Sequence, residues 1–224
     1  MIKASLLALA LFAGTASAAD NAQVNVSVQD KLMDHGTVVS NDATVGLGLR
    51  FSDVFVDGTF VRANFDSISD TTPINGNLTF RSDIGVGLTG DLIGNKWEVS
   101  VNRVLNPVIY SDDYTEARAR ISRGILFAEV NQGFTSNVNE DTYLAVGVET
   151  TAIIPALKVG ALASAVRYDG DSLFTESKFN NAEVFARYNV WRNLDAKVSY
   201  SYGGNDRLGN DVGNQVWGGL NYRF

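Results

Sequence analysis

The sequence predicts an all-β protein: a closed, antiparallel, up-and-down transmembrane β-barrel of about 12 strands, within a range of roughly 10–14. Three observations predict it. Apolar and polar residues alternate with a period of two along most of the chain, which is the pattern of a half-buried strand. The segments that connect these stretches alternate between short and long, and the last stretch ends on the final residue, Phe224.

The first eighteen residues have the pattern of a secretory signal peptide. Lys3 precedes a short apolar core at 6–12, and Ala16-Ser17-Ala18 has the small-x-small form of a cleavage site. The apolar core is too short to cross a bilayer as a helix, and no later segment is long and apolar enough to do so. We therefore expect residues 1–18 to be a signal peptide and residues 19–224 to form one barrel domain.

Nine segments alternate strictly and three are less regular. The regular ones are 23–29, 44–51, 77–88, 97–102, 116–121, 143–149, 182–190, 194–202 and 215–224. The others are 54–65, 125–131 and 157–168. The alternation changes phase within 54–65, which indicates a bulge or a strand end there. Segment 157–168 is apolar on both faces, so its orientation stays open.

The connections fall into two alternating classes. Those expected to be short are 52–53, 90–95, 122–124, 153–156 and 191–193. Those expected to be long are 33–42, 66–75, 105–113, 132–141, 169–178 and 203–213. Short turns at one end and longer loops at the other are typical of outer-membrane barrels, with both termini on the periplasmic side. A soluble β-sandwich, the alternative, has no reason to alternate its connections in this way.

Aromatic residues gather at both ends of the predicted strands, as they do at the two membrane interfaces of a barrel. Beside the short turns or the C-terminus lie Phe51, Trp97, Trp191, Tyr222 and Phe224. Beside the long loops lie Phe65, Tyr110, Tyr114, Tyr168, Tyr200 and Tyr202. The alternative is that strand ends are aromatic by β-propensity alone. We expect Phe224, on the outward face of the last strand, to be recognised by the barrel-assembly machinery.

Residues 34–65 resemble the start of the TorF-like porin family. The resemblance rests on Asp34-His35-Gly36, then Ser40-Asn41-Asp42, then an alternating strand, a tight turn and a second strand to Phe65. His35 stands where the family has arginine, and Val38-Val39-Ser40-Asn41 departs from its Ser-Gln pair. The resemblance implies a small outer-membrane barrel and implies no particular substrate.

The polar faces of the strands give a set of charged residues that would point into the barrel. They are Arg81, Asp83, Glu98, Glu116, Arg118, Arg120, Glu149, Glu183, Arg187, Asp195, Lys197 and Arg223. Six are acidic and six are basic. One interpretation is a pore lined by mixed charges that tunes the passage of small polar solutes. The other is a set of ion pairs that fills and stiffens a closed barrel. Small inward residues such as Gly46, Gly85 and Gly147 leave room and favour the pore.

The predicted long loops are strongly acidic, with Lys178 and Arg207 as their only basic residues. An acidic rim favours cations at the pore entrance and could bind lipopolysaccharide through divalent ions. The alternative is ordinary solvated loops, rich in Asp and Asn because these residues favour turns. The stretch 203–211 resembles one imperfect calcium-binding repeat, and we interpret it as the last loop.

Several function classes are excluded or disfavoured. The chain has no cysteine, a net charge of −7 and a single histidine, His35. An acidic balance argues against nucleic acid, and one histidine beside Asp34 and Ser40 gives no catalytic set. No cofactor or metal is indicated. We expect a monomer in the outer membrane of a Gram-negative-type cell, in contact with lipid and lipopolysaccharide, passing ions and small polar solutes. The rivals are a non-conducting barrel for adhesion or phage binding and, more remotely, an outer-membrane enzyme.

Overall fold

The computed structural model describes residues 21–34, 37–69, 78–105, 113–134, 141–152, 154–167, 178–206, 211 and 213–224. The predicted signal peptide, His35, Tyr110 and Tyr168 lie outside these residues, as do most residues of the predicted long loops. Within the described part, no helix has the length and hydropathy needed to cross a bilayer.

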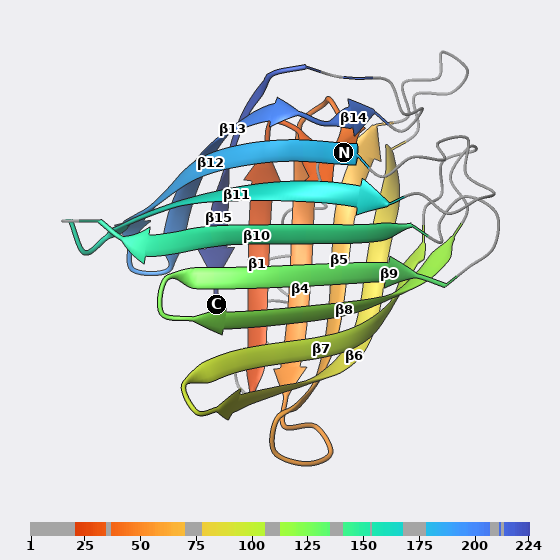
Figure 1. Cartoon of the computed structure of the whole chain (residues 1–224), viewed down its shortest axis with the longest axis vertical. Coiled ribbons are helices and arrows are strands. Elements are labelled where there is room, and N and C mark those ends of the chain that lie inside the picture. The colour runs from red at the N-terminus through yellow and green to blue at the C-terminus, as the bar shows by residue number, and fades with distance from the viewer. Residues whose placement is uncertain are drawn as a thin grey trace.

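Twelve strands form a closed antiparallel barrel, which confirms the predicted fold (Figure 1). In chain order they are β1 (Ala22–Gln29), β4 (Thr44–Ser52), β5 (Thr59–Ser69), β6 (Leu78–Leu92), β7 (Asn95–Leu105), β8 (Tyr114–Arg123), β9 (Leu126–Gly133), β10 (Thr142–Thr151), β11 (Leu157–Arg167), β12 (Lys178–Trp191), β13 (Leu194–Gly203) and β15 (Gln215–Arg223). Neighbours along the chain pair with each other, and β1 closes the ring by pairing with both β4 and β15.

A second, three-stranded sheet lies apart from the barrel wall. It consists of β2 (Leu32–Asp34), β3 (Thr37–Ser40) and β14 (Asn205–Asp206). β2 and β3 are antiparallel, and β14 adds to β3 in parallel. The connection between β1 and β4 therefore has its own secondary structure, where the sequence predicted only a loop at 33–42.

The turn between β4 and β5 is longer than the two residues that the sequence predicted. Residues 53–58 form it, and β5 begins at Thr59 (Figure 1). The backbone N–H of Gly58 donates to the Asp53 carboxylate at 2.7 Å, and both residues adopt a positive φ. The phase change in segment 54–65 therefore arises because its first five residues are not in the strand. From Phe60 onward the strand alternates regularly.

The orientation of β11, which the sequence left open, follows from its pairing with β10. Opposite residues of an antiparallel pair share a face. Gly160 lies opposite Glu149, and Leu162 lies opposite Gly147, so Gly160 and Leu162 face the interior. Lys158 and Ser164 share this inward face, and its glycine, Gly160, lies directly beneath the ring of Phe185, which belongs to β12.

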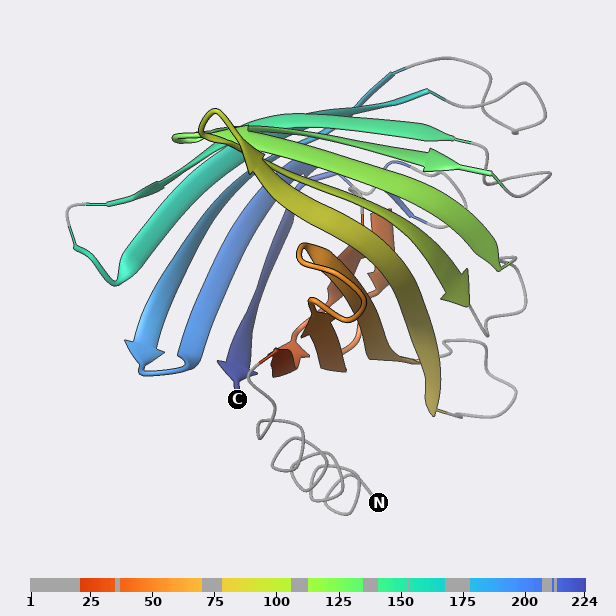
Figure 2. The ribbon, with the colours of Figure 1, turned by 90° about the horizontal axis from the view of Figure 1, so that it is seen from below.

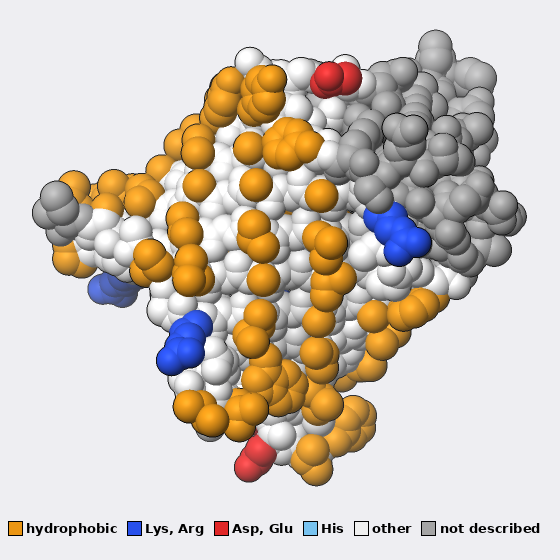
Figure 3. Space-filling view, viewed as in Figure 1, with side chains coloured by type: hydrophobic (Ala, Val, Ile, Leu, Met, Phe, Trp, Pro, Cys, Tyr) orange, Lys and Arg blue, Asp and Glu red, His pale blue; other side chains and the backbone are white. Residues whose placement is uncertain are grey.

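The outside of the barrel is apolar and the inside is polar. Large apolar side chains on the outward faces are half exposed or more, for example Val86, Val101, Val146, Val184 and Leu220. Hydrophobic side chains run in rows across the face seen in Figure 3, and the few charged side chains of that face lie nearer its ends. Buried residues of the described part are mostly polar, with Asn102, Asn131, Ser199 and Ser201 nearly inaccessible. This reversal of the usual soluble pattern is what a hydrocarbon surround requires.

A charge on the outward face tests this assignment. Val146 lies in the middle of β10 and is 61% exposed. We expect Val146→Arg to destabilise the folded barrel in lipid by about 2–4 kcal/mol, the cost of arginine near the bilayer midplane. Val56→Arg, in the 53–58 turn, is the control and should cost little. The measurement is guanidinium unfolding in lipid vesicles; equal unfolding midpoints for the two variants would contradict the assigned lipid-facing surface.

Candidate functional site in the barrel lumen

The lumen is the site that the predicted charged residues share. All twelve of them lie on strands in the described part of the chain, on the faces opposite the exposed apolar rows. We call the end with the short turns the turn end, and the other the loop end. Figure 2 views the barrel from below and shows how the strands curve around the lumen. The charged side chains divide between two walls with different environments.

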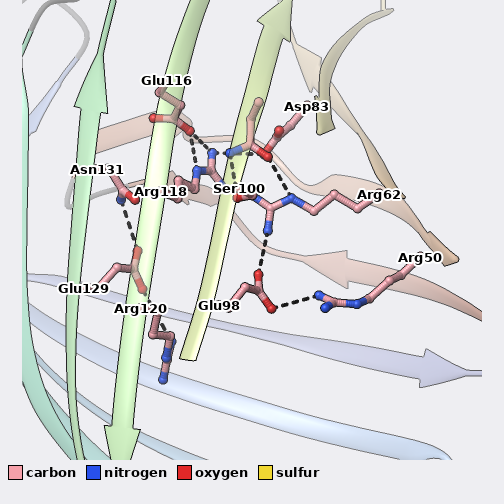
Figure 4. A network of polar contacts seen from close by, with 11 residues as sticks. Arg50, Arg62, Asp83, Glu98, Ser100, Glu116, Arg118, Arg120, Glu129 and Asn131 are labelled. Atoms are coloured by element: carbon pink, nitrogen blue, oxygen red, sulfur yellow. Dashed lines mark hydrogen bonds and ion pairs between the residues drawn. The ribbon is translucent and has the colours of Figure 1, made fainter. Parts of the chain in front are cut away.

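One wall, built from β4 to β9, carries most of the lumen's ion pairs in a cluster of polar contacts (Figure 4). Arg118 contacts Asp83 at 3.0 Å and forms an ion pair with Glu116. Glu98 contacts two arginines at once, Arg50 at 3.1 Å and Arg62 at 3.5 Å. Because the carboxylates of Asp83 and Glu116 are nearly buried, this network holds charges that would be costly to bury alone.

Glycines on the inward face of β6 let side chains from the neighbouring strands β5 and β7 extend over it. Gly85 and Gly87 lie on β6, between β5 and β7. A Cβ on Gly85 would lie 2.0 Å from the Asn102 amide oxygen, and one on Gly87 would lie 2.5 Å from the Phe60 ring. The small inward residues therefore do not leave open space, as the sequence reasoning assumed, because neighbouring side chains fold over them.

The opposite wall, built from β10 to β15, is less densely paired. Lys197 contacts Glu183 at 3.2 Å, and its ammonium lies 4.0 Å from the centre of the Trp217 ring. Near the turn end, Arg223 contacts Asp195 at 2.8 Å, and Lys158 contacts Glu149 at 3.9 Å. These ion pairs do not join one another, and the polar network of this wall is the uncharged hydrogen-bonded cluster of Ser164, Asn180, Asn181 and Ser201.

The β2–β3 hairpin lies inside the lumen toward the loop end. Asp34 forms an ion pair with Arg81 of β6. Met33 lines a cavity together with residues of β8 to β13 and β15, so the hairpin reaches across the barrel. Leu32 and Val38 are buried. Asp34 and Asp66 fall within 33–42 and 66–75, which the sequence predicted to be external loops. That prediction is wrong for both, because Asp66 is on β5 and both residues line an interior cavity beside Arg81.

Three adjoining cavities follow the lumen. The largest, 740 Å³, lies at the turn end and is lined by Gln23, Asn25, Asp195 and Arg223 among others. A second of 260 Å³ shares Arg187, Lys197 and Trp217 with it. A third of 200 Å³ lies toward the loop end and shares Met33 with the second. The hairpin thus borders both inner cavities.

Several lumen residues were missed by sequence reasoning. Arg62 and Glu129 lie in the two segments whose alternation was irregular or short. Arg50 was on a recognised polar face but was not selected. Trp217 was passed over because a large aromatic ring does not suggest a lumen position, although its spacing from Gln215 and Gly219 places it there. Phe60 and Phe127 also face inward, beneath Arg50 and Arg120.

The proposed aromatic girdles are placed as follows. Trp191, Tyr200, Tyr202 and Phe224 are exposed, while Trp97 and Tyr222 are partly exposed. Tyr222 packs edge-to-face against Phe224 with 4.7 Å between ring centres. Tyr114 does not belong to a girdle, because it lies on the inward face of β8 and accepts a hydrogen bond from Arg81 at 3.4 Å.

Among the described residues, no group of three or more His, Asp or Glu side chains is arranged to hold a metal ion. The chain's one histidine lies outside them, as do residues 207–210 of the 203–211 stretch. What the geometry offers is a charged, water-accessible interior with paired side chains.

The comparisons with known proteins bear on the fold. No family model and no curated protein matches the chain. Among solved structures, the KdgM porin is 11% identical with a TM-score of 0.55, covering 90% of this chain and 99% of that one. The NanC porin is 8% identical with a TM-score of 0.56, covering 90% and 98%. A structure from a study of the in-meso crystallisation of membrane proteins is 14% identical with a TM-score of 0.58, covering 91% of this chain and 83% of that one. The chain therefore has the fold of outer-membrane porins.

Proposed function

We propose that this protein is a small passive pore in an outer membrane, passing ions and small polar solutes. One observation carries the proposal: a 740 Å³ charged cavity at the turn end continues into a second cavity inside a barrel whose outer face is apolar. A barrel whose only task was structural would gain from a filled interior, since unfilled polar space contributes no packing. The polar lining keeps water, and therefore solute, in the lumen.

Solute size is set by the hairpin. The β2–β3 hairpin occupies the loop-end half, where the adjoining cavity is 200 Å³. A pore narrowed in this way admits ions and small solutes and excludes large ones.

A second candidate is a non-conducting surface barrel. The network around Arg118 and Glu98 favours it, because such a network stiffens one wall without any need for transport. Permeation separates the two functions. No catalytic role is proposed, since the described lumen offers charge pairs without a nucleophile and base in contact.

Location and partners are part of the proposal. Residues 1–18 would direct export, and the barrel would lie in the outer membrane of a Gram-negative-type cell, as a monomer in contact with lipid and lipopolysaccharide. The resemblance of residues 34–65 to TorF-like porins supports this assignment. We also propose a mild preference for cations at the entrance, because the predicted long loops are acidic, with Lys178 and Arg207 as their only basic residues. A reversal potential of zero in a KCl gradient would contradict that preference.

Liposome swelling tests the pore directly. Vesicles with the refolded barrel should swell in isotonic solutions of small sugars, at rates that fall steeply from a pentose to a trisaccharide. Heat-dependent gel mobility shows whether the barrel in the vesicles is folded. If vesicles with a folded barrel do not swell in any of these sugars, the structural barrel is supported instead.

The final strand gives a prediction about assembly. The backbone N–H of Phe224 donates to the carbonyl of Val24 at 2.9 Å, so the last residue helps to join β15 to β1. We expect deletion of Phe224 to lower the amount of assembled barrel in cells by at least about tenfold, because the closing strand pair loses its end and the assembly machinery loses its signal. The assay is heat-dependent gel mobility of outer-membrane fractions. Phe51→Ala is the control, because Phe51 is an equally exposed aromatic residue at the same end of the barrel, in the neighbouring β1–β4 pair; unchanged assembly after the deletion would argue against the signal.

A further inference from the structure

Three basic residues form a row on the less densely paired wall. Lys158 on β11 lies directly opposite Arg187 on β12, which lies directly opposite Lys197 on β13. Cross-strand partners share a face, so the three side chains project side by side into the lumen. Like charges placed this closely repel one another unless counter-charges are present.

The counter-charges leave one residue of the row without a partner. Glu149 contacts Lys158 at 3.9 Å, and Glu183 contacts Lys197 at 3.2 Å. No ion pair or hydrogen bond among the described residues involves the Arg187 guanidinium. The carboxylates of Glu149 and Glu183 are therefore already engaged with the two lysines, as Asp195 is with Arg223, and the centre of the row keeps an excess positive charge.

This centre lies where the two larger cavities meet. Arg187, Lys197 and Trp217 line both the 740 Å³ cavity and the 260 Å³ cavity. A solute that moves directly from one of these two cavities to the other passes these three side chains.

Unused hydrogen-bond donors lie at the same place. The indole nitrogen of Trp217 and the hydroxyl of Ser199 are buried, and neither has a hydrogen-bond partner among the described residues. Ser199 lies directly opposite Trp217 in the β13–β15 pair. Buried donors are normally satisfied, so two neighbouring ones without a partner point to a ligand rich in acceptors.

We propose that the junction binds small organic anions in which a carboxylate adjoins an apolar face. The carboxylate would contact Arg187 and Lys197, since guanidinium groups bind carboxylates through paired, charge-assisted hydrogen bonds. The apolar face would lie toward the rings of Trp217 and Phe185, both within 5.2 Å of the Lys197 ammonium. If the barrel is the proposed pore, the site also slows the permeation of such anions. Binding itself does not depend on the proposed pore.

Calorimetric titration of the refolded barrel in detergent tests the site, with benzoate as probe and neutral benzamide as its isostere. We expect benzoate to bind, benzamide to bind at least about tenfold more weakly, and Arg187→Gln to lower benzoate affinity at least about tenfold through loss of the charged contact. Arg123→Gln removes the same charge at the exposed end of β8 and should leave affinity unchanged. Each variant is first shown to be folded by its heat-dependent gel mobility.

A second variant keeps the test decisive if Arg187→Gln does not fold. Trp217→Phe keeps an apolar ring but removes the indole N–H, and it should weaken benzoate binding several-fold. The proposal would be overturned if folded Arg187→Gln or folded Trp217→Phe bound benzoate as tightly as the parent protein does. It would also be overturned if the parent protein bound benzylammonium more tightly than benzoate. Benzoate binding in a barrel that shows no conductance would support the site and count only against the pore.

Discussion

Removal of the lumen hairpin is expected to raise the single-channel conductance of the proposed pore at least about twofold, because the β2–β3 hairpin occupies part of the lumen's cross-section. The change replaces residues 31–42 with a four-residue Gly-rich turn. The barrel can accept it because Gln29 already lies opposite Thr44 in the β1–β4 pair, so a short turn can connect the two strands.

A milder change tests the attachment of the hairpin. Asp34→Asn removes the charge that pairs with the nearly buried Arg81 and should produce larger or more variable conductance steps without loss of the barrel. Asp42→Asn is the matched control, since Asp42 is an exposed carboxylate in the same connection. If the hairpin deletion conducts like the parent protein, the limiting constriction lies elsewhere.

The second large effect concerns stability. Arg118→Met should destabilise the barrel by about 3–5 kcal/mol, because it leaves the buried carboxylates of Asp83 and Glu116 with no guanidinium between them. Arg103→Gln breaks an exposed pair with Asp113, at 3.8 Å, and should cost at most about 1 kcal/mol. The two variants are compared by guanidinium unfolding in lipid vesicles.

A companion variant separates the charge from the packing. Adding Asp83→Asn and Glu116→Gln to Arg118→Met should restore most of the lost stability, because the buried charges are then absent. A single Arg118→Met barrel as stable as the parent would mean that the network of Figure 4 contributes nothing net to folding.

The outward faces could be predicted from the sequence with little ambiguity. Lipid selects apolar side chains at every second position, so Val99 and Val101, or Val198 and Tyr200, specify a face by themselves. Alternation failed where a different constraint applied. Val54, Phe55 and Val56 look like a strand but lie in a turn that the Asp53 side chain closes.

The interior was harder to predict because lumen positions accept almost any side chain. The two-residue alternation of the strand places Arg118 inward but does not tell which carboxylate it contacts. Nor does it show that the side chains of Asn102 and Phe60 cover Gly85 and Gly87. Nor can it tell an external loop from one that folds inward. Asp34 was for that reason assigned to the outside, although its carboxylate pairs with Arg81 within the barrel.

Single-channel recording of the purified, heat-modifiable barrel in planar lipid bilayers tests the central claim most directly. A passive pore predicts discrete current steps of one dominant size, which persist in the absence of any added ligand. Insertion of folded protein is verified by recovering it from the vesicles that form the bilayer. If the inserted protein repeatedly gives no current steps, the pore is contradicted and a structural barrel remains.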